Sequence, residues 1–305
     1  MKILFSAKVK LRNPKLAWKT ATMAKFCALL PLLHKDCKLI PNIPLILDDF
    51  IYIRSPRPEH IGAIFKKKPG MIGVVDSDTK CILFESDEEE LVEQQIKAIA
   101  LNGTFVLNAF ARTGSVMCER AFVIRTIRST KVSDIFNLPN ISPPNRFKYE
   151  IDKSTDPAAV KALYSGAKYA LQKDQSMMIS ISRYNGAMSK IPFEDKLIDI
   201  AICLESIFSS QTEISFKFAL YNSILAEENP DKRYAIYDCL RRVYRERSNL
   251  VHGNKSVDVG WVESNWGLIS SIAKLCLIRK IEFLKDKTAN EWSKYLEMLA
   301  LGVAA

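Results

Sequence analysis

The sequence contains few of the residues on which several classes of protein depend. Its 305 residues include only 11 glycines, which argues against a glycine-rich all-β or repeat protein, and only three histidines, which argues against a metalloenzyme built on several histidines. The seven cysteines are scattered and form no C-x2-C pair, so a common zinc site is excluded and reduced thiols are favoured. We therefore expect no metal ion and no cofactor.

Long apolar segments are also lacking. No window of about 18 uncharged apolar residues occurs, so we expect no transmembrane helix and no membrane partner. The first ten residues contain no apolar segment of secretory length, because Lys8 and Lys10 interrupt it. Together with the unpaired cysteines, this predicts a cytoplasmic protein.

The chain does contain enough apolar residues for a core, and it carries excess positive charge. Hydrophobic residues make up 48% and charged residues 26%, and the length fits about two domains. The net charge is +10, and nearly all of the excess lies in residues 1–84, with 15 Lys and Arg against 6 Asp and Glu. Residues 85–305 carry 29 against 28. The basic region is either a solvated lysine surface or a surface that faces a polyanion.

The first part of the chain mixes strand and helix patterns, which predicts an α+β domain of unknown role over residues 1–140. The patterns predict strands at 2–11, 45–53, 103–111 and 119–128, a hairpin at 71–85 with its turn at 76–78, and helices at 16–33 and 87–101. No phosphate-binding loop, nucleophile elbow or carboxylate pair occurs in this part.

Prolines mark the boundary between two domains. Pro139, Pro143, Pro144 and Pro157 lie within 20 or so residues, with Asn and Ser between them. Residues 155–305 then read as an all-helical bundle that opens with Asp156 as the N-cap before Pro157. The predicted helices are 157–188 with a break near 173–174, 193–209, 215–227, a fourth from Pro230, 258–284, and a short last one capped by Thr288.

The fourth predicted helix of the bundle is basic and ends in a histidine. Between Asp231 and Lys255 there are seven Lys and Arg and three Asp and Glu. Gly253 stands where a glycine commonly ends a helix. His252 therefore faces the negative end of the helix dipole, where it can exchange a proton near neutral pH.

Helical spacing tests which residues can act together with His252. Arg245, Asn249 and His252 follow an i, i+4, i+7 pattern and share one face if the helix continues. Arg247 precedes His252 by five residues and points about 140° away from it. The two side chains would meet only if the helix ended early or if they came from two copies across a dimer axis.

An arginine and a titrating histidine can cleave RNA without a metal ion. The 2′-hydroxyl serves as the nucleophile, the histidine moves the proton, and the arginine stabilises the developing charge on the phosphate. The alternative is a capping histidine on a solvated basic face, because an arginine a few residues before a histidine also arises by chance. His60, for example, follows Arg54 and Arg57.

Four segments in a fixed order resemble the Apea-like branch of the HEPN superfamily, over residues 155–285. They are ISISRY at 179–184, FEDKLID at 193–199, CLESIF at 203–208 and YRERSNLVHG at 244–253. The resemblance implies an all-α bundle that pairs as a homodimer. It also implies a metal-independent endoribonuclease with two copies meeting in one cleft, in a toxin–antitoxin, abortive-infection or other antiphage system.

The resemblance assigns roles to individual residues. The catalytic arginine falls on Arg247 and the histidine on His252, with Arg245 as a second phosphate contact. Active members often carry Asn, Asp or His directly after the arginine, whereas this chain has Ser248 followed by Asn249, so the polar helper differs. Glu205 matches a helix glutamate that buttresses the site, or it is a partly buried glutamate paired with an arginine.

Three functions stay open at this stage. The first is an RNA endonuclease in antiphage defence or a toxin-type system, with RNA, a second copy and an antitoxin or other protein as partners. The second is a non-catalytic module that binds RNA, a nucleotide or a protein. The third is a dimerisation domain that serves an N-terminal sensor.

Overall fold

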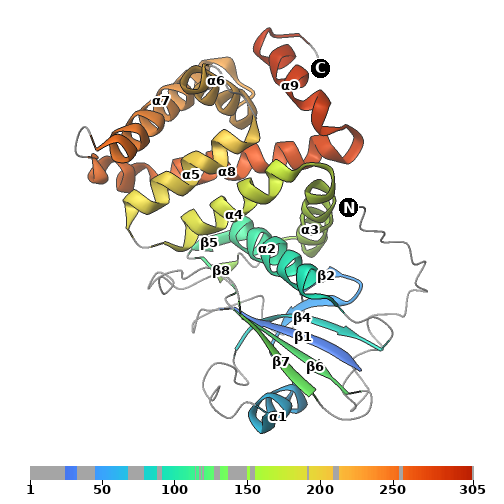
Figure 1. The fold of residues 1–305 in the computed structure, drawn as a ribbon. Coiled ribbons are helices and arrows are strands. Elements are labelled where there is room, and N and C mark those ends of the chain that lie inside the picture. The colour runs from blue at the N-terminus through green and yellow to red at the C-terminus, as the bar shows by residue number, and fades with distance from the viewer. Residues whose placement is uncertain are drawn as a thin grey trace.

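The protein consists of an antiparallel sheet with helices on both faces, followed by a larger group of helices (Figure 1). The computed structural model describes residues 25–32, 45–67, 79–87, 91–113, 115–116, 118, 120–126, 131–136, 150–151, 155–190, 192–208, 213–253 and 257–303. This arrangement confirms the predicted fold class, an α+β N-terminal part followed by an all-helical C-terminal part. In the described residues, no helix is both long enough and apolar enough to span a bilayer.

Among the described residues, the main sheet has six strands in the order β2-β3-β4-β1-β6-β7, and every neighbouring pair is antiparallel. The strands are β1 (Phe26–Pro31), β2 (Leu45–Asp48), β3 (Ile51–Arg54), β4 (Cys81–Ser86), β6 (Arg120–Arg125) and β7 (Lys131–Phe136). Two short strands, β5 (Ala111–Thr113) and β8 (Glu150–Ile151), pair separately.

The central strands are buried on both faces because helices cover each side. Along β1, Cys27 and Leu29 face helix α1 (Pro58–Lys67), and Ala28 and Leu30 face helix α2 (Glu93–Phe110) and the main core. Side chains alternate between the faces of a strand, so a strand covered on both sides is apolar throughout. Figure 1 shows α1 below the sheet and α2 between the sheet and the helical group.

In the described part of the chain, seven helices follow, and several of them begin with caps that the sequence predicts. They are α3 (Pro157–Lys173), α4 (Gln175–Ser189), α5 (Phe193–Ile207), α6 (Ile214–Ala226), α7 (Pro230–His252), α8 (Val259–Asp286) and α9 (Ala289–Ala300). Asp156 accepts a hydrogen bond from Ala158 N–H at 2.9 Å, and Asp174 separates α3 from α4 and caps the latter through Ser176 N–H at 2.8 Å. Thr288 and Glu291 form a capping box on α9.

Two predicted elements are wrong. Residues 103–111, predicted as a strand, are helical through Phe110 and continue α2. The segment is buried on almost every side, so it lacks the polar face that identifies a surface helix, and tertiary packing overrides its strand-like composition. Residues 26–31, predicted as part of a helix, form β1.

Other predicted elements are confirmed or fall outside the described residues. The extended segment 45–53 is the hairpin of β2 and β3, and segment 119–128 contains β6. The predicted helix at 87–101 begins later, at Glu93. The predicted strand at 2–11, the turn at 76–78 and Pro139, Pro143 and Pro144 lie outside the residues that the structure describes.

One hydrophobic core joins the sheet to the helices. Gly103 of α2 lies so close to the sheet that a Cβ atom would come within 2.5 Å of Ile82 Cδ1. On the helical side, the Phe105 ring contacts the Tyr184 ring edge-on, with centroids 5.7 Å apart. The described core is therefore continuous across the predicted boundary between residues 1–140 and 155–305.

Candidate functional site

Helix α7 extends without a break through the residues that the sequence singles out. Asn229 caps its start by accepting a hydrogen bond from Asp231 N–H at 2.9 Å, and Pro230 occupies the first turn. Gly253 ends the helix in the left-handed conformation, with φ of 65°, as the sequence predicts. His252 occupies the last helical position and is exposed.

Arg247 is held by Glu205 of the neighbouring helix α5. Arg247 Nη2 lies 3.5 Å from Glu205 Oε2, and the two side chains are 22% and 23% exposed. The guanidinium also lies 5.9 Å from the centroid of the Tyr244 ring. Burial raises the pKa of Glu205, and the charge of Arg247 counteracts part of that rise. The structure thus pairs Glu205 with an arginine, as one of its two predicted roles requires, and the other role, as a buttress of a catalytic site, stays a prediction.

The structure does not bring Arg247 and His252 together within one chain. Because α7 is helical through both residues, their side chains leave the helix about 140° apart. Arg247 faces α5, whereas His252 faces solvent. Arg245 is 65% exposed and shares the face of His252 and the part-buried Asn249, and Ser248 is also part-buried.

A second charged group ties the end of α7 to the start of α8, and it was not predicted from the sequence. Glu246 is 6% exposed, and its carboxylate accepts a hydrogen bond from Asp258 N–H at 3.3 Å. Arg242 Nη2 lies 2.8 Å from Asp258 Oδ2, and its guanidinium lies 4.3 Å from the Trp261 ring centroid. This group holds the start of α8 against α7.

Two of the segments that carry the family resemblance contact each other. Asp199 of α5 is 3% exposed and binds Arg183 Nη1 at 2.8 Å and Lys190 Nζ at 2.7 Å. Gly186 lets the helices approach, since a Cβ atom there would come within 2.5 Å of Asp199 Oδ2. These motif residues therefore join α4 to α5.

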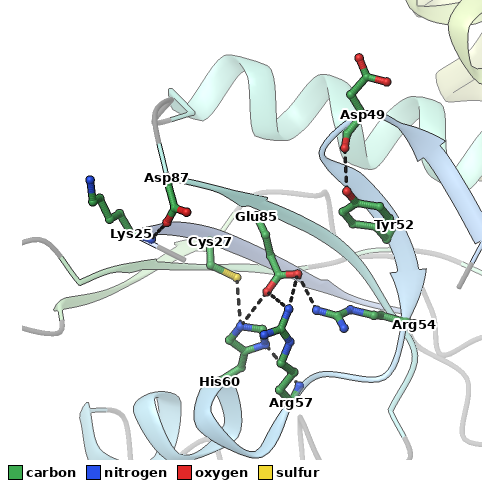
Figure 2. A network of polar contacts seen from close by, with 9 residues as sticks. All are labelled: Lys25, Cys27, Asp49, Tyr52, Arg54, Arg57, His60, Glu85 and Asp87. Atoms are coloured by element: carbon green, nitrogen blue, oxygen red, sulfur yellow. Dashed lines mark hydrogen bonds and ion pairs between the residues drawn. The ribbon is translucent and has the colours of Figure 1, made fainter. Parts of the chain in front are cut away.

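The sheet contains a buried polar cluster that the sequence analysis treated only as an example of chance spacing (Figure 2). Glu85 of β4 lies directly opposite Cys27 of β1, and its side chain is 12% exposed. Arg54 Nη2 lies 2.5 Å from Glu85 Oε2, and Arg57 Nη2 lies 3.3 Å from Oε1. His60, fully buried on α1, places Nε2 3.3 Å from Glu85 Oε1 and 3.7 Å from Cys27 Sγ.

The hydrogen bonds of His60 define which of its ring nitrogens carries the proton. Arg57 N–H donates to Nδ1 at 3.3 Å, so Nδ1 is the acceptor and the ring proton lies on Nε2, facing Glu85. Burial raises the pKa of Glu85, but the bond from His60 and the charges of Arg54 and Arg57 outweigh it and the net pKa is lowered. Glu85 is thus an ionised carboxylate neutralised by arginines.

Cys27, His60 and Glu85 are also the one described group whose donor atoms are close enough to hold a metal ion, all within 4.8 Å of one another. Burial raises the pKa of the Cys27 thiol well above its ordinary range, so the sulfur is protonated. A divalent ion would have to displace that proton and lie beside two guanidinium groups that already bind Glu85. The charge balance favours a buried ion cluster over a metal centre.

Comparison of the chain with protein-family models, with curated proteins and with solved structures found no significant match.

Proposed function

We propose that this protein is a metal-independent endoribonuclease that acts as a homodimer in the cytoplasm. The observation that carries the proposal is the end of α7, where an exposed His252 directly precedes the left-handed Gly253 and follows Arg247, which Glu205 holds in place. The order of motifs that resembles the Apea-like HEPN branch supports the same activity. The free thiols of the six described cysteines suit a reducing compartment.

The proposed reaction is an internal transfer of the phosphate within the RNA chain. His252 in its neutral form accepts the proton of the 2′-hydroxyl, the 2′-oxygen forms a bond to phosphorus, and the bond from phosphorus to the 5′-oxygen breaks. The leaving 5′-oxygen takes up the proton that His252 has accepted, which gives a 2′,3′-cyclic phosphate and a 5′-hydroxyl and returns His252 to its neutral form. Arg247 stabilises the charge on the phosphate oxygens, and Arg245 is a second phosphate contact.

Two copies are needed because one chain does not direct both groups at one phosphate. Arg247 and His252 leave α7 about 140° apart, so a composite site takes Arg247 from one copy and His252 from the other. A toxin-type or antiphage role, with RNA as the substrate and an antitoxin or another protein as a controlling partner, follows from the same resemblance.

The activity is tested by incubating the purified full chain with RNA in EDTA. We expect cyclic-phosphate products from the wild type and loss of at least about a hundredfold in rate for His252→Ala and Arg247→Ala. The matched controls are Val251→Ala, which removes an exposed side chain from the same turn, and Arg241→Ala, which removes an exposed charge from the same helix. Equal rates for wild type and His252→Ala would refute the proposal.

The composite site is tested by combining two inactive chains. Co-expression of Arg247→Ala with His252→Ala gives mixed dimers in which one site carries both native residues. At equal amounts, about half of the dimers are mixed, so about a quarter of the wild-type activity returns. If each chain used its own Arg247 and His252, no activity would return.

One observation favours a second function, a non-catalytic module that binds RNA or a protein partner. The guanidinium of Arg247 is already paired with Glu205 and largely buried, and Ser248 replaces the polar helper that active members of the family carry. This function predicts RNA binding without turnover, and binding that His252→Ala leaves unchanged.

A further inference from the structure

A cavity of about 330 Å³ lies between the end of the sheet region and the helical group. The end of α2 with the residues just after it lines one side, and α4, α5 and α8 line the other. The volume falls at the lower end of the range of small-molecule sites, about 300–1,000 Å³. It does not include Arg247 or His252, so it is separate from the proposed nuclease site.

The lining of the cavity is positively charged. Arg112, Lys196 and Lys274 contribute to it, and among the residues that the structure describes no aspartate or glutamate does. None of these three cations has an ion pair with an acidic side chain in the described part of the chain. The charge of Glu263 acts to raise the pKa of Lys196, but the two side chains form no ion pair. A concave site with one sign of charge concentrates ligands of the opposite sign.

Lys196 is the most constrained of the three cations. It is 3% exposed, and its ammonium group lies 4.7 Å from the centroid of the Phe193 ring and 4.9 Å from that of the Trp266 ring. Burial lowers its pKa, so holding the charge there has a cost that cation–π contacts only partly offset. A buried ammonium without a carboxylate is best explained if an anion supplies the missing partner.

The opposite wall carries a buried hydroxyl without a partner. Ser115 is 3% exposed, and its Oγ forms no hydrogen bond in the described part of the chain. The next residue is fixed by two bonds, because Val116 N–H donates to Asn108 Oδ1 at 2.8 Å and Asn108 Nδ2 donates to Val116 O at 3.2 Å. A native protein rarely leaves a buried hydroxyl unsatisfied, and the rigid support makes Ser115 a preformed donor.

Aromatic side chains complete the lining. Phe193 and Trp266 are both part-exposed, and their rings meet edge-on with centroids 6.1 Å apart. They offer an apolar wall beside the cations, and such a wall binds the face or edge of a planar ring.

We propose that this cavity binds a small organic phosphate that carries a planar ring. The phosphate would bind Lys196, Arg112 and Lys274 and accept the hydrogen bond of Ser115, and the ring would pack against Phe193 and Trp266. The proposal extends beyond the nuclease and does not depend on it, because no residue is shared between the two sites.

The test is calorimetric titration of the full chain with four probes: 5′-AMP, ribose 5-phosphate, adenosine and inorganic phosphate. We expect 5′-AMP to bind best, and adenosine and inorganic phosphate to bind at least about tenfold more weakly. Added salt should lower the affinity for 5′-AMP. Inorganic phosphate or ribose 5-phosphate binding as tightly as 5′-AMP would overturn the role of the ring. No heat from any probe at millimolar concentration would overturn the site.

Variants locate the binding. Lys196→Met keeps the packing between the rings and removes the charge, so we expect the affinity for 5′-AMP to fall about tenfold to a hundredfold. Ser115→Ala should lower this affinity less. Lys294→Met removes an exposed lysine of α9 and serves as the control with unchanged affinity. Unchanged affinity in Lys196→Met would overturn the proposal. If circular dichroism shows that Lys196→Met does not fold, the affinities of Lys274→Met and Arg112→Met for 5′-AMP test the proposal instead, and unchanged affinity in both would overturn it.

Discussion

Glu205 and Arg247 lie on different helices, and their side chains meet with a 3.5 Å contact between Oε2 and Nη2. The pair fixes the arginine that the family resemblance assigns to the scissile phosphate. It also connects the middle of the helical group to the exposed end of α7, where His252 lies.

Replacement of Glu205 by glutamine should lower activity more than it lowers stability. Both side chains of the pair are about one-fifth exposed, so we expect the free energy of unfolding to change by about 1 kcal/mol or less. Arg247 loses its orientation, so the rate of RNA cleavage should fall about tenfold with RNA binding nearly unchanged. Glu297→Gln, an exposed glutamate of α9, is the control for activity. A variant that cleaves at the wild-type rate would show that the pair has no positioning role.

The same pair should show itself in the pH dependence of stability. Burial raises the pKa of Glu205 in the folded state, so the folded chain holds this proton to higher pH than the unfolded chain does. The protonated Glu205 contributes fully to the free energy of unfolding below the unfolded-state pKa of about 4.3, and this contribution is lost as pH rises through the folded-state pKa. Urea unfolding between about pH 4 and pH 7 should therefore show Glu205→Gln gaining stability relative to wild type as the pH rises. A constant difference would mean that burial does not perturb this carboxyl.

Glu85 should behave in the opposite way. Burial raises the pKa of Glu85, but His60, Arg54 and Arg57 outweigh that effect, so the net pKa is lowered. The ionised Glu85 therefore contributes to the free energy of unfolding above about pH 4.3, and this contribution is lost as pH falls through the lower, folded-state pKa. Glu85→Gln leaves two largely buried arginines without their carboxylate and should cost about 3 kcal/mol near pH 7.

Chemical unfolding measures this loss. Glu93→Gln is the matched control, since it breaks an exposed ion pair with Lys97 and should cost about 0.5 kcal/mol or less. If Glu85→Gln were no more harmful than Glu93→Gln, the cluster in the sheet would not be a stabilising element.

Lys280 should be the most sensitive lysine of the helical group. It is 1% exposed, and its ammonium group binds Asp174 Oδ2 at 2.8 Å, Ser176 Oγ at 2.8 Å and the carbonyl of Ile207 at 3.0 Å. Lys280→Ala removes three bonds, opens a cavity and leaves Asp174 unpaired, so we expect a loss of about 3–5 kcal/mol in unfolding experiments.

A double variant separates charge from packing at this position. Lys280→Met combined with Asp174→Asn removes both charges and keeps most of the volume, so it should recover much of the loss. Lys294→Ala is the exposed control. A double variant as unstable as Lys280→Ala would assign the loss to the missing ion pair and hydrogen bonds of Lys280, because the retained volume would then have recovered nothing.

Local signals explain which elements the sequence predicts. Asp156 before Pro157, Pro230 at the start of the fourth helix and Gly253 after His252 are short-range features, and each predicted its helix end correctly. The prediction for segment 103–111 was wrong because a helix buried on nearly all sides has no amphipathic pattern, and the valine and phenylalanines of the segment favour a strand.

Site residues that are close in sequence could likewise be predicted, whereas those brought together only by the fold could not. Arg247 and His252 are five residues apart in sequence, so their spacing could be read and their faces calculated. The partners of His60 could not be found, because Cys27 and Glu85 meet only through the register of β1 with β4. Likewise, Lys196 and Ser115 come from opposite sides of the predicted domain boundary and share a cavity only after α2 docks.

The shared core has a consequence for how the molecule comes apart. Helix α2 packs Gly103 on the sheet and Phe105 on Tyr184, so neither half can lose it without exposing apolar side chains to water. Sheet and helices should then melt in one cooperative transition, and a lesion at Glu85 should lower the melting temperature of helices that never touch it. Cutting the chain between the two halves would yield two aggregation-prone fragments in place of two independent domains.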